Sequence, residues 1–444
     1  MEDGPRRLFA DLDPNALRRL GDDRGDFQRD RDIILYSSAL QRLSTTTQVV
    51  SAESGHVFHN RLTHTLQVAQ VGRRLAEKLV LKQRALTEHL GVDPDVVESA
   101  CLAHDLGHPP FGHLAEKTLN GLVGEQAQGF EGNAQSFRIV TYLGFRSHDY
   151  SGLNLTNRTL GAILKYPWTF AGRPTEKRNK WGAYDSELQS FELATGNTGT
   201  GPYPRSAEAE LMDWADDLTY AIHDAEDFYR AGLIPLHLLL PLASGSRSTA
   251  ERERFLEYVA AKKHQLDELK NTSDEELEDI FAQVLFPYFS LTGPYQGTRD
   301  DRARLRVFTS QLVGRYINGL KLQNPQEGKT VHADDGYRKE IALLKQLTWF
   351  YVIDAPARAA QQHAQRQMIK YLFRTFLGEC RRSPARLLPP YYRERLSDAD
   401  GDTNRVKRIV ADLIAGMTES QALLTYQRLN GIVNGSALDK LMVG

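Results

Sequence analysis

Two histidines and two aspartates of this chain could together bind a divalent metal ion. His104 and Asp105 are adjacent at the end of an apolar helical pattern, and Gly107-His-Pro-Pro110 must end that helix because proline disfavours helix before it. His64 lies on the apolar side of an earlier helical segment, and Asp216 lies on a later one. Each residue alone also fits a structural role in a core or on an acidic face. Together, this mixed nitrogen and oxygen set favours a six-coordinate divalent ion with positions open to water and substrate.

A second histidine and carboxylate pair follows the first. His113 and Glu116 are three residues apart on one helix face, where the carboxylate can orient the imidazole. His108, in the turn after Asp105, is a second candidate for proton transfer. The alternative interpretation of His113 and Glu116 is an ion pair on the protein surface.

Cationic and aromatic residues flank the predicted metal ligands. Arg61 lies one turn before His64, where a guanidinium could bind phosphate oxygens, although a surface arginine is the alternative. Asp216, Tyr220 and Asp224 repeat every four residues and therefore share one helix face. Tyr220 could also be a core residue.

Apolar spacings of three, four and seven residues predict an all-α fold that positions these side chains. Strand patterns are sparse, and neither an internal repeat nor a long heptad run is present. The predicted helices include residues 95–106, 113–122, 133–142, 207–231, 251–270, 274–286, 303–322, 337–380 and 405–429.

Composition changes along the chain predict three regions. Residues 1–33 are charge-dense and predict a polar arm that is at best partly ordered. Residues 34–240 form the predicted catalytic core, within which the charged and glycine-rich residues 171–206 predict a long surface loop. Residues 241–444 predict additional helices that pack on this core.

Bulk composition narrows the class of protein. The net charge of −2 provides no overall positive field, so an anionic ligand must be held by a local cluster. Two cysteines, Cys101 and Cys380, exclude a disulfide framework and suit a reducing cytoplasm. No signal peptide pattern is visible, and the longest apolar run, residues 236–243, is too short to span a bilayer, so we expect no membrane association.

Other nucleotide-binding and hydrolytic motifs are missing from the sequence. Neither a phosphate-binding Gly-x-x-x-x-Gly-Lys-Ser/Thr loop nor a Gly-x-Ser-x-Gly nucleophile elbow occurs. The glycine run at 196–201 follows no strand and predicts a flexible loop rather than a dinucleotide site.

Longer segments around the candidate site resemble the dGTP triphosphohydrolase family of HD-domain phosphohydrolases. The resemblance covers roughly residues 30–430. The matching segments are Phe58-His-Asn-Arg-Leu-Thr-His64, His104-Asp-Leu-Gly-His-Pro-Pro-Phe-Gly-His113, Phe130-Glu-Gly-Asn-Ala-Gln135, Met212-Asp-Trp-Ala-Asp-Asp217 and Ile414-Ala-Gly-Met-Thr418. Asp412-Leu413 departs from the Asp-Tyr that usually precedes the last of these.

The resemblance implies an activity and a set of roles. The expected reaction converts a deoxynucleoside triphosphate, with dGTP favoured, to a deoxynucleoside and inorganic triphosphate by attack of water on the α-phosphorus. His64, His104, Asp105 and Asp216 would hold Mg²⁺ or Mn²⁺, with other first-row metals as alternatives. The remaining roles are proton transfer by His113 with Glu116, phosphate binding by Arg61, sugar contacts by Tyr220 and Asp224, and a base contact by Gln48. Segments 165–168 and 180–184 resemble family segments near the triphosphate.

Two rival functions stay open on the sequence. One is another HD-type nucleotidase or phosphodiesterase, which would release other products. The other is a nucleotide-sensing or single-strand-DNA-binding protein, since residues 381–395 and 405–408 are basic. The family resemblance also implies a homo-oligomer, often a hexamer, and a nucleotide effector.

Overall fold

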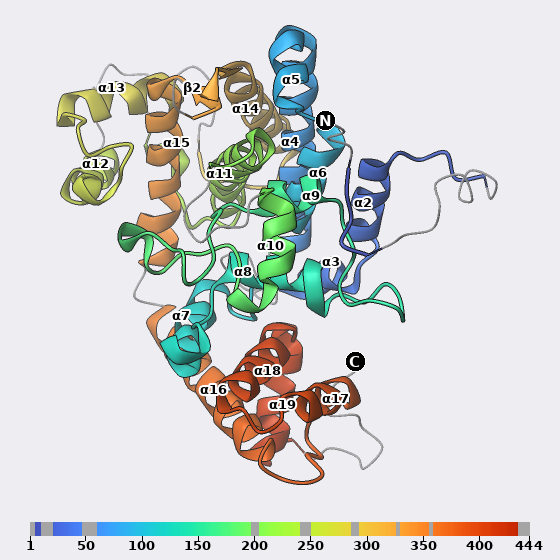
Figure 1. The fold of residues 1–444 in the computed structure, drawn as a ribbon. Helices are drawn as coiled ribbons and strands as arrows, with labels where there is room; N and C mark the ends of the chain where they lie inside the picture. The colour runs from blue at the N-terminus through green and yellow to red at the C-terminus, as the bar shows by residue number, and fades with distance from the viewer. Residues whose placement is uncertain are drawn as a thin grey trace.

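The chain folds almost entirely into helices in the computed structural model, which confirms the predicted all-α class (Figure 1). The structure describes residues 5–9, 21–46, 60–196, 204–239, 250–285, 293–325, 329–354 and 358–433. Within these ranges the single sheet is an antiparallel pair, β1 (Leu320–Leu322) and β2 (Val331–Ala333), with Lys321 opposite His332.

Three helices pack against one another at the centre of the fold: α4 (Arg61–Lys82), α6 (Pro94–Ala103) and α11 (Ala207–Arg230). Their close approach depends on Gly72 of α4. A Cβ atom at Gly72 would lie 2.5 Å from the Cys101 sulfur and 3.6 Å from the Ala215 Cβ, so a larger residue would push the helices apart. This packing brings residues that are distant in sequence to one site.

Each of the three helices begins at a residue suited to capping. The side chains of Asn60, Asp93 and Ser206 accept hydrogen bonds from backbone amides in the first turns of α4, α6 and α11. Pro94 occupies the first position of α6, where its missing N–H costs no helical hydrogen bond. The caps therefore fix where each helix starts, and so which side chains face the common site.

Helix α6 ends at Ala103, three residues before the predicted end. Residues 104–111 form the turn between α6 and the next helix, and we call it the HD turn, after His104 and Asp105. Gly107 of this turn packs directly on α8 (Gly132–Arg138), since a Cβ there would lie 2.2 Å from the Gly132 carbonyl oxygen. The Ser136 hydroxyl accepts from the Gly107 amide at 2.8 Å and donates to the His104 carbonyl at 2.9 Å. These contacts fix the conformation of the HD turn, where helix hydrogen bonds no longer do so.

The C-terminal helices form a second apolar cluster together with α7 (Gly112–Val123). Figure 1 shows α16 (Arg358–Glu379), α17 (Pro390–Asp398), α18 (Thr403–Ala415) and α19 (Glu419–Leu429) grouped beside α7. Leu119 of α7, Phe373 and Ile414 are buried together in this cluster. A buried ion pair at 2.9 Å between Arg138 of α8 and Asp412 of α18 joins the cluster to the core.

Several predicted boundaries differ from the structure, for local reasons. The predicted helix 337–380 consists of α15 (Asp335–Thr348), a π-helical turn (Trp349–Ile353) and α16, while Gly416 lies in the break between α18 and α19 within 405–429. Helix α14 (Arg299–Asn318) ends earlier than predicted, where β1 begins. Helix α2 (Asp26–Leu35) starts inside the predicted arm and packs on α6, with Asp30 buried.

The predicted loop 171–206 contains ordered structure in its described part. Helix α10 (Leu188–Thr195) packs on α9 (Asn157–Ile163), and Trp181 and Tyr184 are buried. Buried aromatic residues stabilise this segment despite its polar composition, because burying such rings removes a large apolar area from water.

The remaining labelled helices do not line the cleft described below. They are α3 (Ser38–Arg42), α5 (Arg84–Leu90), α12 (Ala250–Lys262) and α13 (Asp274–Leu285). Among the helices that the structure describes, none has both the length and the apolar character needed to cross a membrane.

Candidate active site

The four residues predicted as metal ligands come together between α4, α6 and α11. His64 Nε2 lies 3.2 Å from Asp216 Oδ1, and His104 Nε2 lies 3.6 Å from the same oxygen. Asp105 Oδ1 is 3.5 Å from His104 Nε2. One donor atom from each of His64, His104 and Asp105 lies within 4.8 Å of the others. The cluster thus directs imidazole nitrogens and carboxylate oxygens to one point.

The orientation of the His104 ring fits a metal ligand. Its Nδ1 lies 2.6 Å from the Cys101 carbonyl oxygen, which can only accept, so Nδ1 carries the proton. The buried Nε2 makes no hydrogen bond to any described residue and faces the two aspartates. A ring nitrogen that donates to a backbone carbonyl while the other faces a cluster is the usual arrangement of a metal-bound histidine.

The electrostatics of the cluster favour a bound cation. Burial opposes a charge on His104, but the carboxylates of Asp105 and Asp216 outweigh it and raise the His104 pKa to about 9. Burial also opposes ionisation of the two aspartates, but nearby cations hold the pKa of both carboxyls well below the usual value. Both carboxylates are therefore charged at neutral pH.

Arg61 contacts the cluster directly. Its Nη1 donates to Asp105 Oδ2 at 2.6 Å, and both side chains are buried. The guanidinium also lines the cleft described below, so it can orient Asp105 with one nitrogen and bind an anion with another. Gly112 leaves room for it, since a Cβ there would lie 3.1 Å from Arg61 Nη2.

The second histidine and carboxylate pair forms beside the metal cluster. His113 Nδ1 lies 2.9 Å from Glu116 Oε2, and Lys180 Nζ lies 3.2 Å from the other oxygen of Glu116. Burial opposes the charge on Glu116, but His113 and Lys180 lower its pKa well below the usual value. An ionised Glu116 accepts a hydrogen bond from the Nδ1–H of His113, so Nε2 is the nitrogen of that ring that could take part in proton transfer.

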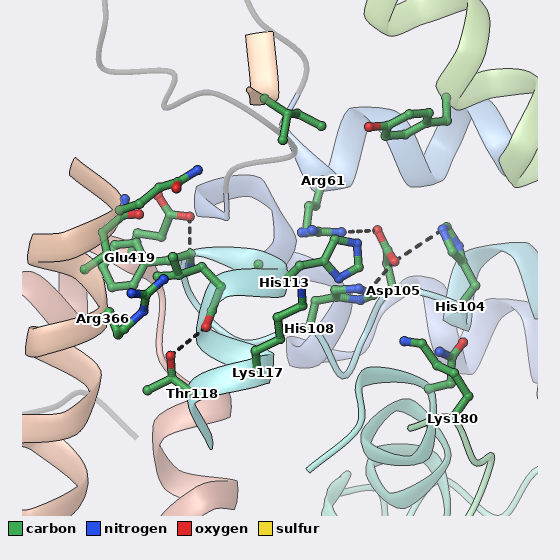
Figure 2. Close-up of a pocket in the computed structure, with 18 of the residues that line it drawn as sticks. Arg61, His104, Asp105, His108, His113, Lys117, Thr118, Lys180, Arg366 and Glu419 are labelled. Atoms are coloured by element: carbon green, nitrogen blue, oxygen red, sulfur yellow. Dashed lines mark hydrogen bonds and ion pairs between the residues drawn. The ribbon is translucent and has the colours of Figure 1, made fainter. Parts of the chain in front are cut away.

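His108 lies between the metal cluster and His113. Its Nδ1 is 3.0 Å from Asp105 Oδ1, and its ring centre is 5.4 Å from that of His113 (Figure 2). Burial lowers the pKa of His108 despite the nearby Asp105 carboxylate. Because His108 is buried and 71% of the His113 side chain is exposed, His113 is the better placed of the two to reach a substrate.

Of the residues predicted to contact the sugar and the base, only Tyr220 lines the cleft among those that the structure describes. Tyr220 lines the cleft, whereas Asp224, one turn further along α11, is buried and not part of the cleft wall. Burial and the neighbouring Asp227 raise the Asp224 pKa well above the usual value. Gln48 lies outside the described residues. The proposed sugar and base contacts therefore stay predictions.

A cleft of about 960 Å³ opens from the metal cluster toward α16. Figure 2 shows His113, His108 and Arg61 grouped around Asp105, with Arg366 and Glu419 across the cleft. Besides Arg61, further cations line its walls. Lys165 and Lys180 lie in segments that the family resemblance already placed near the triphosphate, whereas sequence reasoning missed the others because no spacing pattern connects them to the predicted metal ligands. These lining cations are Lys117 from α7, Lys345 from α15, Arg366 and Lys370 from α16, and Lys165 and Lys180 from the segments between α9 and α10.

Two known domain families match this chain, and each match includes residues that line the cleft. The HD domain family matches residues 61–221, which include all four predicted metal ligands, and the phosphohydrolase-associated domain matches residues 331–428, which include α16. The fold and the site thus define an HD-domain phosphohydrolase.

Similarity to curated proteins extends over nearly the whole chain. It is 36% identical to the deoxyguanosinetriphosphate triphosphohydrolase-like protein of Corynebacterium efficiens, over 92% of each chain. The Streptomyces coelicolor protein of that name is also 36% identical, over 94% of this chain and 95% of the relative. The chain belongs to the deoxyguanosinetriphosphate triphosphohydrolase-like family.

Proposed function

We propose that this protein hydrolyses deoxynucleoside triphosphates, with dGTP favoured, to a deoxynucleoside and inorganic triphosphate. One observation carries the proposal: the cluster of two histidines and two carboxylates opens into a cleft lined by cations. Such a cleft attracts a polyanion despite the chain's net charge of −2. The relatives' names support dGTP as the favoured substrate.

A divalent cation, Mg²⁺ or Mn²⁺, would be held by His64, His104, Asp105 and Asp216. The buried, unbonded Nε2 of His104 and the two ionised carboxylates fit such an ion. When bound, the ion supplies Lewis-acid chemistry to phosphoryl oxygens and makes water more acidic.

Proton transfer is assigned to His113. Glu116 fixes its Nδ1 proton, so Nε2 exchanges protons with the leaving 5′ oxygen or with the attacking water. Glu116 also stabilises the positive charge that the ring carries when it is protonated. Arg61 is hydrogen-bonded to Asp105 and lines the cleft. We assign it to the stabilisation of negative charge on the α-phosphate oxygens.

The two outer phosphates are assigned to the wall formed by α7 and α16. Lys117, Arg366 and Lys370 line the cleft and form no ion pair with any described residue. Lys165 and Lys180, in contrast, are already paired with carboxylates. Cations without acidic partners are the ones whose charge a triphosphate can neutralise without breaking an existing pair.

Sugar selection is assigned to Tyr220, which lies one turn after Asp216 on the cleft wall. A ring packed on C2′ would exclude a ribose hydroxyl by steric contact. The protein should therefore turn over dGTP faster than GTP.

The test is product analysis by ion-exchange chromatography after incubation with each dNTP and NTP and with Mg²⁺ or Mn²⁺. The proposal expects inorganic triphosphate and deoxynucleoside from wild type and none from Asp105→Ala. Glu340→Gln is the matched control, because Glu340 is a buried, paired carboxylate on α15 that does not line the cleft. Monophosphate or pyrophosphate products would indicate another HD hydrolase. Inactivity with single nucleotides and with nucleotide mixtures, which test for an effector, would favour a sensing function.

A further inference from the structure

Arg42, at the end of α3, binds the HD turn without touching a carboxylate. Its Nη2 donates to the carbonyl oxygens of Leu106 at 2.7 Å and His108 at 2.9 Å. Its Nη1 donates to the Met417 carbonyl at 3.2 Å. Among the described residues it forms no ion pair. Burial and the nearby Arg61 lower the Arg42 pKa to about 10, so the guanidinium is charged at neutral pH.

Met417 belongs to residues 416–419, which comprise the break after α18 and the first residue of α19 and which we call the C-terminal turn. Thr418 and Gln421 form a reciprocal capping box at the start of α19. The Gly416 amide donates to the Asp412 carbonyl at 2.9 Å, and the Asp412 side chain is paired with Arg138. The C-terminal turn is therefore anchored to α18 and α19, and through Asp412 to α8, by contacts other than those with the HD turn.

A second contact joins the two turns close to His113. The Phe111 amide donates to Glu419 Oε1 at 3.2 Å. Phe111 has a φ of 68°, which is uncommon for a residue with a side chain, and Gly112 follows with a φ of 58°. An uncommon backbone conformation persists where its surroundings hold it, and these two residues set the direction in which His113 leaves the turn.

We propose that Arg42 and Glu419 are positioning residues that hold the HD turn against the C-terminal turn. They fix the backbone on both sides of the Pro109-Pro110 corner, and so the relative placement of Asp105, His108 and His113. Neither needs to contact the reacting atoms for this role. The inference rests on the proposed function for its kinetic consequence, but its structural consequence is independent of any substrate.

The kinetic test compares Arg42→Met with Arg408→Met. Arg408 is a matched control, because its buried Nη2 also donates to two carbonyls, those of Ala127 and Gly129, away from the HD turn. Arg42→Met should lower kcat at least about tenfold with KM changed less than about threefold, and Arg42→Lys should restore part of kcat. Arg408→Met should keep kcat per folded molecule. Equal losses of kcat in the two methionine variants would overturn the proposal.

Hydrogen–deuterium exchange measures the same effect without any activity. Full-length Arg42→Met and Glu419→Ala, which removes the acceptor for the Phe111 amide, should each speed exchange in residues 106–114, while Arg408→Met should not. Unchanged protection of these residues in the first two variants would overturn the proposal even if the kinetics changed. Faster exchange in a protein that releases no triphosphate would support the positioning role and count only against the proposed function.

Discussion

Replacing Glu116 by glutamine isolates the contribution of one charge to the proposed proton transfer. Glutamine keeps the size and an acceptor oxygen for His113 Nδ1, at 2.9 Å in the wild type, but removes the negative charge. A hydrogen bond to a charged group contributes about 1.5–3 kcal/mol. Because 71% of the His113 side chain is exposed, solvent screening favours the lower half of this range.

A loss of about 1.5–2 kcal/mol corresponds to a fall of about 10- to 30-fold in kcat, since about 1.4 kcal/mol is a factor of ten. KM should change little, because Glu116 does not line the cleft. Steady-state release of inorganic triphosphate from dGTP, with Glu340→Gln as control, measures the effect.

A double-mutant cycle decides whether the charge acts through His113. In a His113→Asn background, Glu116→Gln should lower kcat by less than about threefold further, because its partner ring is gone. A full 10- to 30-fold loss in that background would refute the reasoning, since Glu116 would then act by another route.

Three further predictions concern the metal, the phosphates and the core. Asp105→Ala should abolish Mn²⁺ binding measured by electron paramagnetic resonance, whereas unchanged affinity would exclude Asp105 as a ligand. Arg366→Gln with Lys370→Gln should raise KM about tenfold with little change in kcat, and the salt dependence of KM should weaken; a loss confined to kcat would contradict a role in binding. Asp412→Asn should destabilise the fold by about 3 kcal/mol at pH 7, because it leaves Arg138 with one buried carboxylate fewer. Arg138 lowers the Asp412 pKa against the effect of burial, so the carboxylate stabilises the fold above its unfolded pKa near 4. The difference from wild type in urea unfolding should therefore shrink as the pH falls below about 4, and a constant difference would contradict this assignment.

Most helix positions and the candidate metal ligands could be predicted from local sequence. The adjacency of His104 and Asp105 before a proline-enforced break, and the place of His64 on an apolar helix face, are features of short segments. Capping residues and apolar periodicity act over a few residues, so the starts of α7 and α11 lie within one residue of their predicted positions. Boundaries failed where tertiary packing replaced helix hydrogen bonds, as at Gly107 and in the aromatic segment around Trp181.

The sequence by itself determined the class of the fold, the set of residues that could hold a metal ion and the pairing of His113 with Glu116. Only the tertiary structure decided which cations face the cleft: Lys117 and Arg366 come from helices that are far apart in the chain and share no pattern with the predicted metal ligands. It also decided that Arg42 and the C-terminal turn hold the HD turn. The physical reason is that a periodic pattern shows which face of a helix is buried, whereas the partner that covers that face depends on the packing of the whole chain.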